Sequence, residues 1–271
     1  MKQIVYTISD SSGETATNFA RSMMAQFNEI DTTQKRYSFI KDIDQLTRIL
    51  QHAQQDQALV FYTLSNPEFD QIVKNFDHDK HMLCFDILSP YLTMIEAFTG
   101  QKASHEIGAA RKLSTQYFKR IEAIDFAAEN DDGKNPHSMV EADVVLLGIS
   151  RTSKTPLTFY LANQEIKVMN LPLVPSVQLP DELWEIDPQK IVGLTNDEEV
   201  LRKIREERML SYGLKAQTNY SSTEKIQQEL QYAQNLYDQL GCLVINVANK
   251  SIEEVAAIIE EKLQLNTFSA N

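Results

Sequence analysis

Cysteine is scarce in this chain of 271 residues, which contains only Cys84 and Cys242, each within an apolar run. Their spacing does not match a metal site built from cysteines. A free cysteine in apolar surroundings behaves mainly as a small hydrophobic residue. We therefore expect two buried, reduced thiols rather than a metal or redox centre.

Long hydrophobic runs are also absent, since none approaches the roughly 20 residues that cross a bilayer. The first residues, Met1–Tyr6, have the pattern of a strand and show no apolar core of a secretory signal. We expect a cytoplasmic protein that does not enter a membrane.

Positive charge is in short supply, with 26 Lys and Arg against 38 Asp and Glu, for a formal net charge of -12. Nucleic acids and anionic membranes are bound mainly through Lys and Arg, so the balance disfavours both partners. A few focused cationic groups can still hold an anionic nucleotide inside an acidic molecule. The hydrophobic fraction of 42% is ordinary for a soluble enzyme.

Short apolar runs alternate with helical patterns along the chain, which indicates α/β structure with parallel sheets. We predict an N-terminal parallel α/β domain (1–105), a helical connector (106–140) and a P-loop kinase-like α/β domain (141–271). Strands are predicted at 3–8, 58–63, 82–86, 142–147, 168–171, 191–194 and 243–247. Helices are predicted after residue 15 and at 43–53, 67–75, 105–129, 156–162, 197–211 and 222–240.

A loop that resembles a phosphate-binding P-loop follows the predicted strand 142–147. It reads Gly148-Ile149-Ser150-Arg151-Thr152-Ser153-Lys154-Thr155, so Ser153 replaces the second glycine of G-x-x-x-x-G-K-[ST]. Loop N–H groups would wrap the phosphates, Lys154 would neutralise them and the Thr155 hydroxyl would coordinate Mg²⁺. The alternative is a plain strand–turn–helix with a surface lysine. The apolar strand before the loop and the helix after it favour the functional interpretation.

Four separated motifs resemble the bacterial pyruvate, phosphate dikinase regulatory proteins and their relatives that act on phosphoenolpyruvate synthase. They are the loop with Pro156, Ser9–Ala16, Tyr117–Ile124 with Asp131-Asp132-Gly133, and Asn246-Val247 with Lys250–Glu254. Serine is familiar in this family at the position of Ser153. The resemblance covers nearly the whole chain, with Ala248 as a slight departure where a threonine is expected.

The resemblance implies a bifunctional enzyme. Such proteins phosphorylate a threonine of the dikinase with ADP, releasing AMP, and remove the phosphate with inorganic phosphate, releasing pyrophosphate. We expect one loop to serve both directions, with Lys154 essential to each. The partner would be pyruvate, phosphate dikinase or phosphoenolpyruvate synthase, and a homodimer would suit an enzyme that meets an oligomeric substrate.

The target hydroxyl needs a base, and Asp131 and Asp132 are the best candidates because Gly133 lets their turn approach closely. A solvated acidic turn is the competing interpretation, and the sequence does not decide which aspartate acts.

Three further features stay open. The turn Ser9–Thr15 is either a second anion site or a capping box of Ser11 or Ser12 with Glu14 or Thr15. Arg202, Arg205 and Arg208 share either a lid-like face or an ordinary solvated helix. His105 is more typical of a structural residue than of a catalytic one, and Ser251 with Glu254 predicts a capping box.

Two other functions compete with the regulator: a small-molecule P-loop kinase and a nucleotide sensor without catalysis. About 105 residues of separate α/β structure before the loop favour an enzyme that docks a large protein partner.

Overall fold

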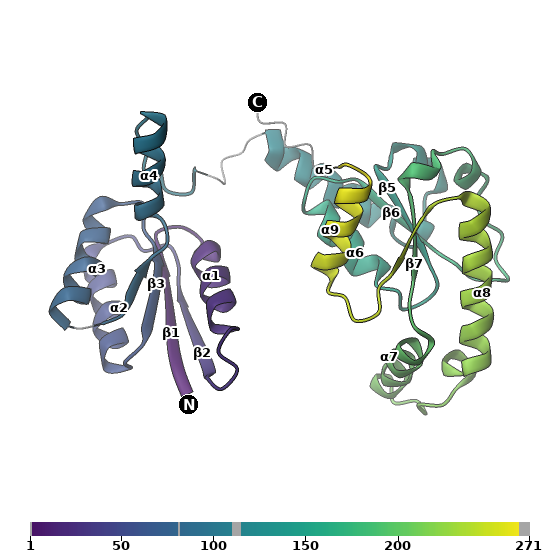
Figure 1. Cartoon of the computed structure of the whole chain (residues 1–271), viewed down its shortest axis with the longest axis horizontal. Helices are drawn as coiled ribbons and strands as arrows, with labels where there is room; N and C mark the ends of the chain where they lie inside the picture. Colours follow the sequence, from purple (N-terminus) through teal and green to yellow (C-terminus); the bar gives the residue numbers. More distant parts are fainter. Residues whose placement is uncertain (1, 81, 110–114, 266–271) are drawn as a thin grey trace. The chain divides into compact units, whose positions relative to one another are not determined.

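The computed structural model describes residues 2–80, 82–109 and 115–265. The chain divides into two compact units, Met1–Lys112 and Leu113–Asn271, each built on its own four-stranded sheet (Figure 1). All strand pairs in both sheets are parallel, so the chain is an α/β protein with two parallel sheets, as predicted.

The first unit contains a sheet with strand order β2-β1-β3-β4. Its strands are β1 (Lys2–Ser9), β2 (Asp31–Tyr37), β3 (Leu59–Thr63) and β4 (Cys84–Asp86), and its helices are α1 (Glu14–Met24), α2 (Ile43–Gln55), α3 (Pro67–Lys80) and α4 (Ser89–Thr99). Helix α1 covers one face and α2 and α3 cover the other (Figure 1). Side chains of successive residues in β1 point to opposite faces of the sheet. Val5 therefore packs with Ala20 of α1, and Tyr6 packs with Leu46 of α2.

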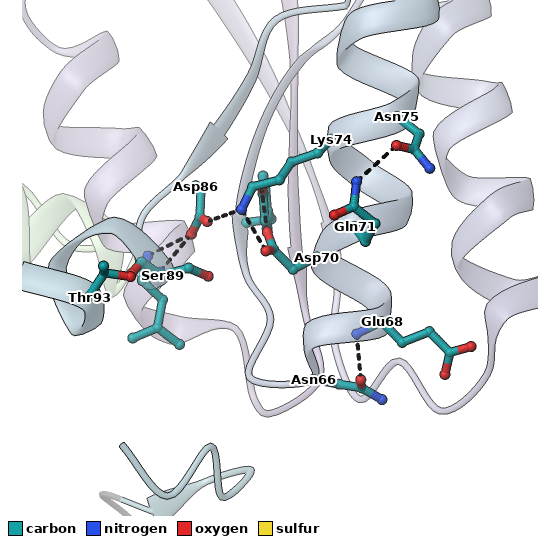
Figure 2. Close-up of polar contacts among 11 residues, drawn as sticks. Asn66, Glu68, Asp70, Gln71, Lys74, Asn75, Asp86, Ser89 and Thr93 are labelled. Atoms are coloured by element: carbon teal, nitrogen blue, oxygen red, sulfur yellow. Dashed lines mark hydrogen bonds and ion pairs between the residues drawn. The ribbon is translucent and has the colours of Figure 1, made fainter. Parts of the chain in front are cut away.

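The junction of β4 and α4 is held by a polar cluster (Figure 2). Asp86 Oδ1 accepts hydrogen bonds from the N–H groups of Leu88 and Ser89, both at 2.9 Å. Lys74 Nζ lies 2.6 Å from Asp70 Oδ2 and 3.8 Å from Asp86 Oδ2. These contacts fix the start of α4, which is necessary because α4 itself contains no buried residue.

The second unit contains a sheet with strand order β6-β5-β7-β8. Its strands are β5 (Val144–Gly148), β6 (Val168–Pro172), β7 (Ile191–Thr195) and β8 (Leu243–Asn246), and its α-helices are α5 (Thr115–Glu129), α6 (Lys154–Ala162), α7 (Glu198–Ser211), α8 (Thr223–Leu240) and α9 (Ile252–Lys262). Every residue of β5 is buried. Val144 and Leu146 pack with α6 and α9, whereas Val145 and Leu147 pack on the side of α8.

Local sequence accounts for several helix starts. Ser222 accepts a hydrogen bond from Lys225 N at the start of α8. Ser251 and Glu254 form the predicted capping box of α9, with both reciprocal bonds present. In the described part of the chain, no helix is both long and apolar enough to cross a membrane.

Three elements differ from the sequence prediction. Strand β2 was not predicted, because six of its seven residues are exposed and it carries no apolar pattern. Helix α4 was also missed; its sequence is rich in apolar residues, yet the structure buries none of them. Residues 105–108 are not helical, so the helix predicted from residue 105 is observed only from Thr115; residues 110–114 lie outside the described residues.

Candidate functional site

The loop 148–155 lies at the carboxyl end of β5, between the strand and the start of α6. Strand β5 pairs with β6 on one side and with β7 on the other. The chain therefore leaves β5 toward one side and later returns on the opposite side, which makes this end of the sheet a topological switch point. Open parallel α/β sheets bind ligands at such positions.

Residues with positive φ alternate with residues of negative φ along the loop, a pattern that forms an anion-binding concavity. Arg151 has φ 73° and Ser153 has φ 61°, both in the left-handed region. Ser153 is also the N-cap residue of α6, and its side chain makes no capping hydrogen bond. The first N–H groups of α6 are thus left for another acceptor, and this geometry suits a phosphate oxygen.

The start of the loop requires a glycine at position 148, because Thr152 and the backbone of Leu194 lie too close for a side chain there. A Cβ at this position would lie 2.4 Å from Thr152 Oγ1 and 3.2 Å from the backbone oxygen of Leu194. Thr152 is fully buried and donates a 2.9 Å hydrogen bond to the carbonyl of Ile149, which closes the loop on itself.

Lys154 is buried within this loop, with only 7% of its surface exposed. Its Nζ donates a 3.1 Å hydrogen bond to the carbonyl oxygen of Ile149. Burial lowers the pKa of Lys154 to about 8, opposed by the charges of Asp132 and Asp131 and assisted by Arg151 and Arg205. An arriving anion would restore the full charge, so the lysine is suited to neutralise phosphate.

Asp131 is joined to the loop by a buried asparagine. Asn170 of β6, fully buried, donates from Nδ2 to Asp131 Oδ1 at 2.7 Å, and Thr155 Oγ1 donates to the same oxygen at 3.3 Å. Asn170 Oδ1 in turn accepts from the backbone N–H of Asp132 at 3.2 Å. The acidic turn and the loop, distant in the sequence, are therefore parts of one site.

Asp132 differs from its neighbour in conformation and exposure. It has φ 55°, its side chain is exposed, and its carboxylate forms no hydrogen bond with any described residue. Gly133 follows at φ 70°, and a Cβ there would lie 2.6 Å from Leu171 Cδ1. The turn is thus packed tightly on β6 while the Asp132 carboxylate stays available.

The predicted arginine face of α7 is not a shared site. Arg205 is fully buried and Nη2 donates to the carbonyl of Ser150 at 3.1 Å. Arg202 pairs with Glu206, and Arg208 lies over the ring of Tyr212. Only Arg205 of the three reaches the loop, so neither alternative describes them all: Arg202 and Arg208 make local contacts, whereas Arg205 is buried.

The turn Ser9–Thr15 belongs to the first unit. Of the two alternatives for this turn, the capping box is wrong, because Gly13 is the N-cap residue of α1 and makes no side-chain capping bond. Asp10 instead accepts from the N–H groups of Ser65 at 2.6 Å and Asn66 at 3.1 Å. The turn and His105 line a cavity of about 400 Å³.

Three residues that sequence reasoning missed complete the site: Asn170, Tyr220 and Glu229. Asn170 is the one with a sequence signal, because an asparagine inside an apolar strand must find hydrogen-bond partners. Tyr220 and Glu229 lie 70 and 24 positions from the residues they contact, and nothing in their local sequence marks them.

The described residues contain no group of three or more His, Cys, Asp or Glu side chains that could hold a metal ion. Both cysteines are free and half-buried, and burial raises the pKa of the Cys84 thiol to about 12. The expectation that both thiols are buried is therefore met only in part, because each is half-buried.

The fold and the loop define a parallel α/β protein with a buried lysine and a paired acidic turn at the switch point of its second sheet. The chain belongs to the kinase/pyrophosphorylase family, which it matches over residues 5–259. It is 49% identical over 265 residues to pyruvate, phosphate dikinase regulatory protein 2, so named, of Enterococcus faecalis, covering 98% of this chain and 96% of that protein. A protein named as a pyruvate, phosphate dikinase regulatory protein in Clostridioides difficile is 45% identical over 264 residues, covering 97% and 94%.

Proposed function

We propose that this protein is a bifunctional regulator that phosphorylates a threonine of pyruvate, phosphate dikinase with ADP and removes that phosphate with inorganic phosphate. The observation that carries the proposal is the meeting of Lys154, Thr155 and the Asp131–Asp132 turn at the carboxyl end of β5. The family and the names of its relatives support a kinase/pyrophosphorylase that acts on the dikinase.

In the forward direction, the loop holds the two phosphates of ADP with its N–H groups and with Lys154. The threonine oxygen of the target forms a bond to the β-phosphorus. The bond from that phosphorus to the bridging oxygen breaks, and AMP leaves. Asp132 accepts the threonine proton, because its carboxylate is exposed and forms no hydrogen bond with any described residue.

In the reverse direction, the same loop holds inorganic phosphate. A phosphate oxygen forms a bond to the phosphorus of phosphothreonine, the bond to the threonine oxygen breaks, and pyrophosphate forms. The proton that the attacking hydrogen phosphate loses passes to Asp132 and from there to the leaving threonine oxygen, which leaves the carboxylate in the state needed for the forward reaction. One anion site thus serves ADP, which gives up a phosphoryl group, and inorganic phosphate, which accepts one.

Magnesium fits the donor set at this site. Thr155 Oγ1 and the Asp131 carboxylate are oxygen donors of the kind that Mg²⁺ prefers, and few protein ligands are needed when phosphates and water complete the shell. The Thr155 hydroxyl donates its hydrogen bond to Asp131, so the lone pairs of its oxygen are left for the ion. Bound Mg²⁺ would neutralise charge on the transferring phosphoryl group.

The test is to incubate the full chain with ADP labelled at the β-phosphate and either purified dikinase or purified phosphoenolpyruvate synthase. We expect AMP and phosphothreonine to form in equal amounts on the dikinase, and pyrophosphate to form when inorganic phosphate is added later. Phosphorylation of the synthase and not of the dikinase would show that the synthase is the protein substrate. Preference for ATP and a small-molecule acceptor, or ADP binding without turnover, would overturn the proposal.

A further inference from the structure

Arg205 is the largest fully buried side chain of the protein's described part, and it is charged. A buried guanidinium is costly unless its donors are paired. Nη1 donates to the carbonyl of Tyr220 at 3.0 Å, and Nη2 donates to Glu229 Oε2 at 2.7 Å and to the carbonyl of Ser150 at 3.1 Å. Only Nε has no hydrogen-bond partner among the described residues. One side chain of α7 therefore joins α8, the connection between the two helices, and the loop 148–155.

Tyr220 holds the same loop residue from a second direction. Its hydroxyl lies 2.7 Å from Ser150 Oγ, and its ring lies under the Arg205 guanidinium, with 4.7 Å from Cζ to the ring centroid. Ser150 is thus fixed through its side chain by Tyr220 and through its carbonyl by Arg205. No other residue of the loop receives two such contacts from α7 and the connection to α8 among the described residues.

Fixing the Ser150 carbonyl also fixes the next N–H group. The two groups belong to one planar trans peptide and point in opposite directions. With the carbonyl held toward Arg205, the N–H of Arg151 points away from it. Arg151 and Ser153 have the left-handed backbone that lets successive N–H groups converge on an anion.

Resting on the proposed function, we propose that Arg205 and Tyr220 are positioning residues that hold the 148–155 loop in its phosphate-binding conformation. They touch neither nucleotide nor target and act through Ser150. Without them the loop must be ordered when ADP or phosphate arrives, which weakens the binding of both ligands.

Tyr220→Phe tests the inference with little risk to the fold, because it removes only one hydroxyl. We expect the Kd for Mg²⁺–ADP, measured by titration calorimetry on the full chain, to rise about twofold to tenfold. Ser150→Ala should raise the Kd by the same factor. The double variant should show no further rise in Kd, because both changes remove the same hydrogen bond between Ser150 and Tyr220. Arg205→Lys should weaken binding by more than tenfold, because lysine lacks the planar fork that reaches Ser150 and Tyr220 together.

Arg208→Gln and Tyr212→Phe are matched controls from the same region, and their side chains contact each other rather than the loop. Positioning predicts a higher KM for both ADP and inorganic phosphate, at unchanged melting temperature for Tyr220→Phe. Unchanged Kd and KM in Tyr220→Phe, or additive losses in the double variant, would overturn the inference while wild-type transfer activity still supports the proposed function. Wild-type ADP binding without protein phosphorylation would instead overturn the proposed function alone.

Discussion

Asp131 Oδ1 and Thr155 Oγ1 lie 3.3 Å apart, which joins the turn after α5 to the first turn of α6. The same carboxylate oxygen accepts a 2.7 Å hydrogen bond from the buried Asn170. Asp131 is thus hydrogen-bonded to the loop and to β6, whereas Asp132 is exposed and its carboxylate forms no hydrogen bond with any described residue. Under the proposed function the two aspartates have different roles, because Asp131 would help to hold Mg²⁺ and Asp132 would act as the base.

Replacing each aspartate by asparagine should separate these roles. We expect Asp132→Asn to lower kcat in both directions by about 10²- to 10⁴-fold, the usual contribution of a general base, with little change in ADP affinity. Asp131→Asn should instead raise the Mg²⁺ concentration required for half-maximal activity. Steady-state rates across a magnesium series check both outcomes.

Asp238→Asn is the matched control, because Asp238 lies on α8 and, among the described residues, accepts a hydrogen bond only from Gln234 of the same helix. It should leave both activities unchanged. A raised magnesium requirement in Asp132→Asn, with a lowered kcat at an unchanged magnesium requirement in Asp131→Asn, would reverse the assignment.

Lys154→Met should abolish both activities but stabilise the free protein. The pKa of Lys154 is lowered from 10.5 to about 8 by burial, so keeping the folded chain charged costs about 3 kcal/mol below pH 8. Methionine removes that cost. We expect a higher free energy of unfolding at pH 7, by up to about 3 kcal/mol, measured by urea unfolding.

The pH dependence of this gain has a definite sign. The destabilisation by Lys154 is complete below pH 8 and disappears as pH rises toward 10.5, where the unfolded lysine also loses its proton. The stability difference between variant and wild type should therefore shrink between pH 8 and pH 10.5. A difference that stays constant over that window would contradict the lowered pKa.

The sequence predicted the elements with strong local patterns. The fully apolar strand β5, the loop after it and the capping box of α9 follow from residue order alone. Strand β2 was missed because it has no apolar pattern in the sequence. Helix α4 has apolar residues, but they stay exposed, so its place in the fold does not follow from a buried face.

The site was predicted only in part, for the same reason. The identity of Lys154 and the acidic turn are visible in the sequence, whereas the bond between Asp131 and Asn170 spans 39 positions. Of the three evenly spaced arginines on α7, only Arg205 contacts the loop, and this contact depends on tertiary packing. Contacts that depend on how distant elements meet leave no local pattern to read.

The binding of ADP should depend on pH through Lys154. Below pH 8 the amine is charged before ADP arrives, whereas above pH 8 binding must also take up a proton. We expect affinity for Mg²⁺–ADP to fall as pH rises past about 8, by up to about tenfold per unit. Calorimetry at pH 9 in two buffers with different ionisation heats measures the proton uptake.

Lys154→Arg is the control for that experiment, because arginine stays charged over this range. Its ADP binding should show no proton uptake at pH 9, whatever its affinity. Equal uptake in both proteins would assign the proton to another group.

Ser153 should tolerate glycine but not a β-branched residue. Its φ of 61° lies in the region that glycine adopts freely, so Ser153→Gly should raise the free energy of unfolding by about 0.5–1 kcal/mol and keep ADP affinity. Glu165→Gly, at φ 71° after α6, should give a similar gain and so controls for relief of strain. Ser153→Val should lose ADP binding, because a β-branched side chain opposes this backbone. If Ser153→Gly instead weakens ADP binding in calorimetry, the serine hydroxyl itself donates to the phosphate, and the serine in place of glycine is then a ligand rather than a tolerated substitute.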